Sequence, residues 1–228
     1  MCGIYCIFGE SLGPGHLLLN ARGPDQLAYW NHPTLPLHMA FHRLRIQGNT
    51  PEAMQPFINS QWTVMCNGEI FNHADLGTTK SGSDCEVLLD MLSQHSPGEL
   101  CCHLDAEFAF IAWDNINNKI IVARDPYGVR PLYMGRTSTG GIVWASELKS
   151  MTDICDHVEQ FRPGHYMIFN CDTNSVDKYI SYNIDNIYLT LKDAVRKRIQ
   201  PGLTCCLLSG GLDSSLVASL TQSMMEDQ

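Results

Sequence analysis

The sequence of 228 residues has few basic residues and no long apolar run. It carries 15 lysines and arginines against 24 aspartates and glutamates, a formal net charge of −9. Because no dense basic run could follow a phosphate backbone, nucleic acid is not expected as a partner. No apolar stretch reaches the length of a membrane span, and the N-terminal segment lacks the basic flank of a secretory signal. We therefore expect a cytoplasmic protein without a membrane partner.

Cysteine is abundant, with 10 residues, but the C-x-x-C spacing typical of zinc sites is absent. The closest cysteines are adjacent, as in Cys101-Cys102 and Cys205-Cys206. Neighbouring residues on a strand point to opposite faces, so such a pair cannot easily hold one ion. Without an export signal, a disulfide framework is not expected either. All but one or two of these cysteines are interpreted as reduced, buried core residues, and Cys2 is the exception.

Cys2 follows Met1 directly. Methionine before so small a residue is normally removed, and the chain would then begin with a residue that carries both a thiol and a free α-amine. Their ordinary pKa values, about 8.5 and about 7.7–8.0, are close enough for the amine to take the thiol proton at neutral pH. The sequence therefore suggests a cysteine nucleophile that carries its own base.

Short β-rich or apolar runs separated by turn residues dominate the first 180 residues. The predicted strands cover residues 4–8, 37–41, 62–66, 108–113, 119–123, 132–134, 142–145 and 166–169. A helix is predicted over residues 84–95, with Ser83 as N-cap and Glu86 completing a capping box, and a weaker helix follows Ser146. The pattern predicts an α+β fold with two packed antiparallel sheets flanked by helices.

The pattern changes near residue 180. An amphipathic helix is predicted over residues 190–200, then an apolar strand over 204–208, the turn SGGLDSS and a helix that begins near Asp213. The buried side of this last helix is expected to carry Leu216, Val217, Leu220 and Met224. Glycines 210 and 211 would let backbone amides approach a phosphate beside the helix N-terminus. The turn matches neither a P-loop nor a dinucleotide-binding fingerprint, and a generic glycine turn is the alternative.

Eight motifs in order resemble those of the glutamine-dependent asparagine synthetases. They are MCGI at residues 1–4, RGPD at 22–25, FHRL at 41–44, NGEIFNH at 67–73, SDCE at 83–86, RDPYGVRPLY at 124–133, ASELKS at 145–150 and LLSGGLDSS at 207–215. The resemblance implies an N-terminal-nucleophile hydrolase sandwich as a glutaminase domain over residues 1–185. It also implies that residues 186–228 begin a truncated α/β ATP-pyrophosphatase domain. Synthetase domains are much longer, so we expect a glutaminase-competent chain with only a short piece of the synthetase half.

Within the first domain, the resemblance assigns a role to each matching residue. Cys2 would be the nucleophile, and the Asn67 side chain with the Gly68 backbone N–H would form the oxyanion hole. Arg43 would bind the α-carboxylate of glutamine, and Glu69 and Asp84 its α-ammonium group. The backbone of Ile46 and Gln47 would line the pocket. This half needs no cofactor, and the RGPD turn is interpreted as structural support in which Arg22 and Asp25 form an ion pair.

The second domain would bind ATP and Mg²⁺ and activate the aspartate side chain for attack by ammonia. Phosphate contacts are assigned to Ser209, Gly210, Gly211, Ser214 and Ser215. Asp213 would bind Mg²⁺, and Leu207 would meet the adenine. Glutamine, aspartate and ATP are the expected small-molecule partners, and a homodimer is compatible with the sequence.

Three departures from the family pattern stand beside these assignments. The segment between Cys2 and RGPD is short, and Ala21 stands where a histidine commonly precedes the arginine. Gln47 replaces a small apolar residue, and the synthetase segment stops one helix after the phosphate loop. Two other functions stay open. One is another amidotransferase with the same glutaminase domain, and the other is a non-catalytic module that binds glutamine or docks onto a partner.

Overall fold

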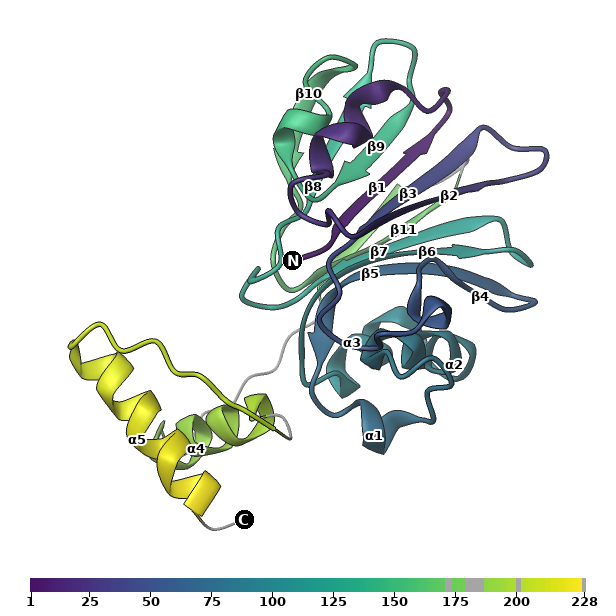
Figure 1. Ribbon diagram of the computed structural model, residues 1–228. Coiled ribbons are helices and arrows are strands. Elements are labelled where there is room, and N and C mark those ends of the chain that lie inside the picture. The colour runs from purple at the N-terminus through teal and green to yellow at the C-terminus, as the bar shows by residue number, and fades with distance from the viewer. Residues whose placement is uncertain (171–173, 179–186, 200–201, 227–228) are drawn as a thin grey trace. The chain divides into compact units, whose positions relative to one another are not determined.

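The computed structural model describes residues 1–170, 174–178, 187–199 and 202–226. It divides into two compact units, Met1–Ile180 and Ser181–Gln228 (Figure 1). The predicted domain boundary at 185/186 lies outside the described residues. No helix among the described residues is long and apolar enough to cross a membrane.

Two antiparallel sheets form the body of the first unit, as predicted. The first sheet has the order β10-β8-β9-β1-β3-β2 and the second β12-β11-β7-β6-β5-β4. The strands of the first sheet are β1 (Gly3–Phe8), β2 (Gln26–Asn31), β3 (Leu37–Arg43), β8 (Tyr133–Thr137), β9 (Ile142–Ala145) and β10 (Cys155–Gln160). Those of the second are β4 (Phe57–Ile58), β5 (Trp62–Ile70), β6 (Ala106–Asp114), β7 (Lys119–Arg124), β11 (His165–Phe169) and β12 (Asn174–Lys178).

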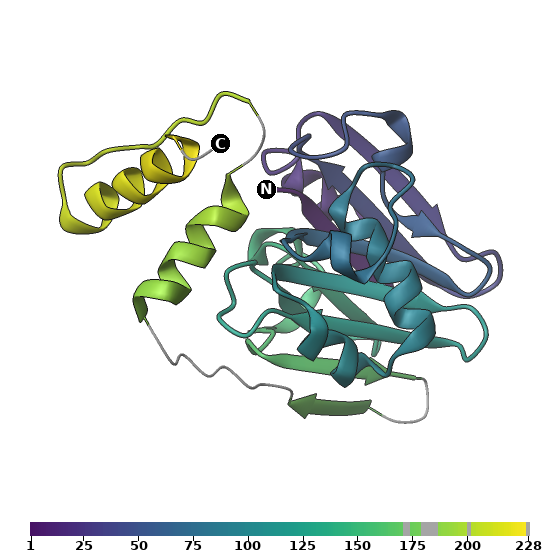
Figure 2. The same ribbon diagram turned by 90° about the horizontal axis from the view of Figure 1, so that it is seen from below.

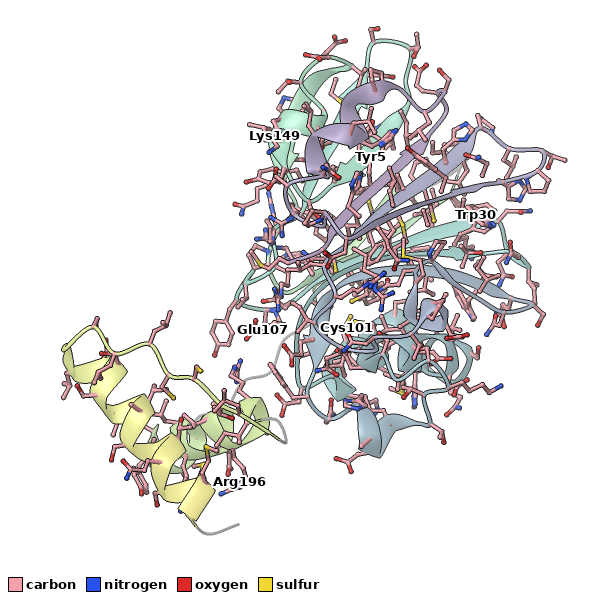
Figure 3. All side chains as sticks on the ribbon, viewed as in Figure 1. Tyr5, Trp30, Cys101, Glu107, Lys149 and Arg196 are labelled. Atoms are coloured by element: carbon pink, nitrogen blue, oxygen red, sulfur yellow. The ribbon has the colours of Figure 1, made fainter. Side chains whose placement is uncertain are left out.

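Strand β1 shows how the sequence builds a layered core. Its side chains alternate between the two faces of the sheet. Ile4 and Cys6 join the apolar core between the sheets, whereas Tyr5 and Ile7 join a second core on the outer face. All four are fully buried, so β1 is a central strand covered on both sides (Figure 3 labels Tyr5).

Short helical segments cover the outer faces of both sheets (Figures 1 and 2). The first sheet carries η1 (Pro14–Leu19) and η4 (Leu148–Ser150). The outer face of the second sheet carries α1 (His73–Leu76), η3 (Asp84–Val87), α2 (Leu88–Gln94) and α3 (Pro97–His103), and η2 (Pro51–Ala53) lies between β3 and β4 in the chain. These segments bury Leu88 and Cys101 against Phe108 and Phe110 of β6.

The predicted helix over residues 84–95 begins with a 3-10 turn, and its predicted capping box is wrong. Ser83 makes no side-chain cap. The Glu86 carboxylate instead accepts hydrogen bonds from the backbone N–H groups of Lys80 and Ser81, each at 2.8 Å. A capping box does form one helix later, between Ser96 and Glu99 of α3. A local motif therefore predicts a cap only where the preceding loop leaves the carboxylate free. The weaker helix after Ser146 is a single 3-10 turn.

The second unit contains α4 (Ile187–Arg198) and α5 (Leu212–Glu226), close to the two predicted helices. Val195, Leu220 and Met224 form a small core between them. The predicted burial of Leu216 and Val217 is wrong, since both are more than a third exposed. The predicted strand over 204–208 does not form either. An isolated apolar run has no neighbouring strand to satisfy its backbone, so it stays irregular here.

Candidate active site

One cavity of the first unit is lined by every residue predicted for the glutamine site. These are Cys2, Arg43, Ile46, Gln47, Asn67, Gly68, Glu69 and Asp84. The start of β1 meets the end of β3 because the two strands pair antiparallel, with Gly3 opposite His42. The end of β5 and the start of η3 supply the remaining residues. Residues up to 82 positions apart in the sequence thus share one cavity wall, and their roles stay predictions.

The sulfur of Cys2 is held by the backbone of Leu44. The Leu44 N–H donates to Sγ at 3.4 Å, and the thiol donates to the Leu44 carbonyl oxygen at 3.6 Å. Burial raises the pKa of the Cys2 thiol, while the Leu44 hydrogen bond and the nearby α-ammonium group oppose that rise. With Met1 in place the thiol is therefore mostly protonated at neutral pH. Met1 itself lines the cavity, and burial lowers the pKa of its ammonium group.

Arg22 fixes the backbone of the nucleophile. Its Nε donates to the carbonyl oxygen of Cys2 at 2.9 Å, and its Nη1 bonds the Glu147 carboxylate at 3.2 Å. The predicted ion pair between Arg22 and Asp25 is thus wrong. Asp25 instead accepts a hydrogen bond from the Arg45 N–H at 2.7 Å. The RGPD and ASELKS motifs meet in space because Arg22 belongs to the first and Glu147 to the second.

Asn67 and Gly68 lie in the last part of β5, where they pair with Ala109 and Phe108 of β6. Asn67 is buried, and its Nδ2 donor has no partner among the described residues. Buried donors are rarely left unpaired, so an orphan in a cavity wall suggests a ligand that completes it. A Cβ at Gly68 would lie 2.5 Å from the carbonyl oxygen of Glu107, so only glycine fits there. Two N–H groups directed at a developing oxyanion are what amide hydrolysis requires.

The Arg43 guanidinium is buried and oriented by its neighbours. Nη1 donates to Gln26 Oε1 at 2.9 Å and to the Thr50 carbonyl oxygen at 3.1 Å, and Nη2 donates to the Gly48 carbonyl oxygen. These contacts use three of the five donors of a guanidinium and leave two for a carboxylate ligand. Burial lowers the pKa of Arg43, but a guanidinium stays charged throughout the neutral range.

Two carboxylates line this cavity and differ in their hydrogen-bond partners. Asp84 is buried, and its Oδ2 accepts the Ile70 N–H at 2.6 Å. Burial raises the pKa of Asp84, and the Ile70 hydrogen bond partly opposes that rise. Glu69 is already engaged, because its Oε1 accepts a hydrogen bond from Gln47 Nε2 at 2.9 Å. The unusual Gln47 therefore competes for a group that was predicted to bind the substrate ammonium.

Sequence reasoning missed five polar groups of the cavity wall, namely Gln55, Cys66, Ser83, Cys85 and Arg130. The buried Gln55 clamps the backbone of Cys66, donating from Nε2 to its carbonyl oxygen and accepting its N–H at Oε1. Arg130 pairs with Glu107 at 3.5 Å. No local pattern marked Gln55, but Arg130 lies inside a quoted motif.

The RDPYGVRPLY motif builds the loop that carries Arg130. The buried Arg124 donates to the carbonyl oxygens of Arg130, Phe161 and Gly128 at 2.6–2.8 Å. Asp125 accepts the Arg130 N–H at 3.0 Å. Arg124 and Asp125 therefore form hydrogen bonds with the backbone groups of this loop, and the loop places Arg130 at the cavity.

The predicted nucleotide residues gather in the second unit, around the N-terminus of α5. Ser214 and Ser215 donate to the Gly211 carbonyl oxygen at 3.1 and 2.8 Å, and Ser209 bonds Ser214 at 3.0 Å. Gly210 has a φ of +85°, which favours glycine.

Backbone N–H groups at the start of a helix suit a phosphate group. The hydroxyl groups of Ser214 and Ser215, however, donate to the Gly211 carbonyl oxygen in this structure. The predicted nucleotide residues do not form an adenine pocket, because Leu207 is 95% exposed. Asp213 is exposed, and no cluster of three metal-binding side chains occurs among the described residues.

Comparisons with known proteins agree with this division. A model of the glutamine amidotransferase domain matches residues 1–159, and a model of asparagine synthase matches residues 186–228. A probable glutamine-hydrolysing asparagine synthetase from Acanthamoeba polyphaga mimivirus is 33% identical over 99% of this chain and 50% of its own length. The corresponding synthetase of Sandersonia aurantiaca is 36% identical over 99% and 48%. In Saccharomyces cerevisiae a further synthetase is 35% identical over 96% and 43%. The chain thus spans about half the length of these relatives.

Solved structures show the same fold at low identity. The glutamine phosphoribosylpyrophosphate amidotransferase of B. subtilis, complexed with ADP and GMP, superimposes with a TM-score of 0.67 at 17% identity. That match covers 97% of this chain and 64% of the other. An allosteric regulatory enzyme of purine biosynthesis matches with a TM-score of 0.63 at 19% identity, over 81% of this chain and 50% of the other. The likeness confirms the predicted sandwich of two antiparallel sheets.

Proposed function

The chain belongs to the glutamine amidotransferase family, and on that premise we propose that its first unit hydrolyses glutamine to glutamate and ammonia through a thioester at Cys2. The observation that carries the proposal is that Cys2, Arg43, the orphan amide of Asn67 and the Asp84 carboxylate line one cavity. The reaction requires a nucleophile, a group that binds the α-carboxylate, a donor to the oxyanion and a partner for the α-ammonium group. These four groups meet those requirements in that order.

The reaction begins once Met1 has been removed. The α-amine of Cys2 then takes the thiol proton, and the thiolate attacks the side-chain amide carbon of glutamine. Asn67 and Gly68 stabilise the resulting oxyanion, each donor contributing about 3–4 kcal/mol to the transition state. Collapse of this intermediate expels ammonia, which leaves with the proton that the amine had collected. Water then attacks the thioester and releases glutamate.

The substrate would be held by its amino-acid end. Arg43 has two N–H donors left for the α-carboxylate. A planar guanidinium can bind a carboxylate through two such parallel hydrogen bonds. Asp84 would accept from the α-ammonium, with Glu69 as a second acceptor once Gln47 releases it. Ile46 and Gln47 would line the mouth of the pocket.

The role of Cys2 as the nucleophile has a direct chemical test. A diazoketone analogue of glutamine should alkylate Cys2, and mass analysis should find the adduct on the N-terminal peptide. The Cys2→Ala variant should neither react nor release ammonia from glutamine, whereas the exposed Cys102→Ala should behave as the parent chain. An adduct on another residue, or none at all, would favour a non-catalytic module.

For the whole protein we infer asparagine synthesis in the cytoplasm, with ATP, Mg²⁺ and aspartate as further requirements. The asparagine synthase match over residues 186–228 supports this inference, as do the relatives named above. When bound, ATP would activate the aspartate carboxylate as an adenylate, with the loop of residues 209–215 on its phosphates and Asp213 on the metal ion. A form that includes the rest of the synthetase should exchange pyrophosphate into ATP only when aspartate is present. Pyrophosphate exchange that does not depend on aspartate would favour another amidotransferase.

A further inference from the structure

A second cavity lies between the two sheets, at the end of the first unit away from the glutamine cavity. Strand β1 begins beside the glutamine cavity, and Phe8 at its other end lines the second one. Trp113 of β6 and Phe169 of β11 line the wall that the second sheet provides. The two cavities share no lining residue, so the second one has no part in the reaction proposed above.

This second cavity is large enough for a small molecule and reaches the protein surface. Its volume is about 310 Å³, and small-molecule sites in proteins span about 300–1,000 Å³. The lining runs from Thr34, which is exposed, to Ile120, which is fully buried in the core between the sheets. A ligand can therefore enter from solvent and lie against the core.

The aromatic rings that wall the cavity hold one another in place. Phe8 and Phe169 meet edge to face, with ring centres 5.5 Å apart at an angle of 67°. His32 and Trp113 meet in the same way, at 5.3 Å and 78°. Trp30, which is labelled in Figure 3, also contacts the His32 ring, with ring centres 5.9 Å apart. Edge-to-face pairs are a favoured arrangement of such rings, so the cavity is formed before any ligand binds.

Two of the lining side chains carry N–H donors. Trp113 is 1% exposed, and its Nε1 has no hydrogen-bond partner among the described residues. His32 accepts the backbone N–H groups of Thr34 at 3.2 Å and Leu35 at 2.9 Å through its Nδ1. Burial lowers the pKa of His32, so its ring is neutral at neutral pH. Because Nδ1 accepts, the proton of the neutral ring is on Nε2, which is the second donor.

The charge of the lining limits the ligand. Among the described residues, no aspartate, glutamate, lysine or arginine lines the cavity. Burying a charge without a partner is costly, so a phosphate, a carboxylate or an amine does not fit. The aromatic and aliphatic walls suit a flat ring system, and the two donors suit an oxygen or nitrogen acceptor on that ring.

We propose that this cavity binds an uncharged, planar aromatic compound that carries a carbonyl oxygen or a ring nitrogen as acceptor. The acceptor takes the N–H of Trp113, and the rings of Phe8 and Phe169 pack against the ligand. A second acceptor on the ligand would meet the Nε2–H of His32. Binding here does not depend on glutamine hydrolysis, because the two cavities are separate.

The experiment titrates the full chain, labelled with nitrogen-15, with coumarin, an uncharged lactone of two fused rings. The four tryptophans each give one indole N–H signal in the NMR spectrum. We expect the Trp113 signal to shift with a Kd on the order of 100 µM, typical of a ligand of this size. The Trp62 signal is the matched control, because its Nε1 is also buried without a partner among the described residues but does not line the cavity. No shift of the Trp113 signal, or an equal shift of both signals, would overturn the proposal.

Two further probes test the class of ligand. Naphthalene has the same two fused rings without an acceptor, so its Kd should be about two- to tenfold higher, the value of one net hydrogen bond. Coumarin-3-carboxylate carries a charge, and its Kd should be at least tenfold higher than that of coumarin. Tighter binding of naphthalene or of the carboxylate than of coumarin would overturn the proposal.

Variants test the residues that carry the proposal. Trp113→Phe keeps an aromatic wall and removes the N–H, so the Kd of coumarin should rise about two- to tenfold while that of naphthalene stays within twofold. Trp62→Phe should change neither value. Leu35→Phe fills part of the cavity and should weaken both probes. An unchanged Kd of coumarin in both Trp113→Phe and Leu35→Phe would overturn the proposal.

The outcome is independent of the proposed glutaminase. Cys2→Ala should bind coumarin with the Kd of the parent chain. A chain that binds coumarin but releases no ammonia from glutamine would contradict the proposed function and support the second site. A chain that hydrolyses glutamine but shows no shift of the Trp113 signal would overturn the second site alone.

Discussion

The Nε of Arg22 donates a hydrogen bond of 2.9 Å to the carbonyl oxygen of Cys2. The same guanidinium is held from the other side by Glu147, which also pairs with Lys149 at 2.7 Å. The nucleophile therefore sits at the end of a short chain of charged groups that joins two segments more than a hundred residues apart. Its backbone is fixed before any substrate binds, and this arrangement makes Arg22 a positioning residue.

Replacing Arg22 by alanine should lower kcat for glutamine by about 10- to 100-fold, since a nucleophile displaced by an ångström loses about that factor. The KM for glutamine should change much less, because Arg22 does not line the cavity. Steady-state kinetics on the folded variant measure both quantities. Lys149→Ala is the control and should keep nearly full activity, as its exposed ion pair lies beyond Glu147. A KM effect larger than the kcat effect would contradict the positioning role.

Asn67→Ala tests the predicted oxyanion hole. Removing one such donor typically costs a factor of about 10² to 10³ in kcat, and the KM for glutamine should stay within a few-fold. Thermal unfolding should shift little by comparison, because Nδ2 has no partner to lose among the described residues. A variant that loses stability but keeps its kcat would show that this amide is structural.

Gln47→Ala tests whether this side chain restrains Glu69. Freeing the carboxylate from a hydrogen bond of 2.9 Å should lower the KM for glutamine by about two- to tenfold, the value of one net hydrogen bond. Gln26→Ala should have the opposite effect, because it removes a partner that orients Arg43. A higher KM in Gln47→Ala would mean that the amide contacts the substrate itself.

Asp84→Asn should separate stability from binding. The pKa of Asp84 is raised in the folded state, so that state binds the proton more tightly than the unfolded chain does. The stability contributed by this group is present at low pH and is lost as pH rises from the ordinary carboxyl pKa, about 3.9, through the raised value. At neutral pH the variant should thus be more stable than the parent, measured by denaturant unfolding across pH.

The same variant should bind glutamine worse, with a KM roughly 10- to 100-fold higher, since a hydrogen bond to a charged group is lost. The exposed Asp90→Asn is the control and should change neither quantity. If the free energy of unfolding of the variant differed from that of the parent by the same amount at every pH, Asp84 would not carry a raised pKa in the folded state.

Sequence patterns predicted the inner strands well and the edge strands poorly. Strands such as β1 and β6 are apolar on both faces, so their runs stand out. Strand β2 alternates between half-buried and exposed positions, and β10 is mostly polar, so neither gave a signal. The predicted strand over 204–208 failed for the converse reason, since an apolar run becomes a strand only beside a partner.

The site shows a similar division. Motif resemblance named Cys2, Asn67 and Asp84, and the structure places them on one cavity. It could not show that Arg22 pairs with Glu147, because that contact depends on how two distant segments meet. Nor could it reveal Gln55, whose importance comes from a backbone clamp without a local pattern.

The most direct test compares ammonia release from glutamine by two chains, one that begins at Cys2 and one that keeps a residue ahead of it, with the first residue verified by intact mass. Blocking the amine removes the base and leaves a buried thiol of raised pKa, so the longer chain should be at least 100-fold slower at neutral pH. Equal rates in the two chains would contradict the account.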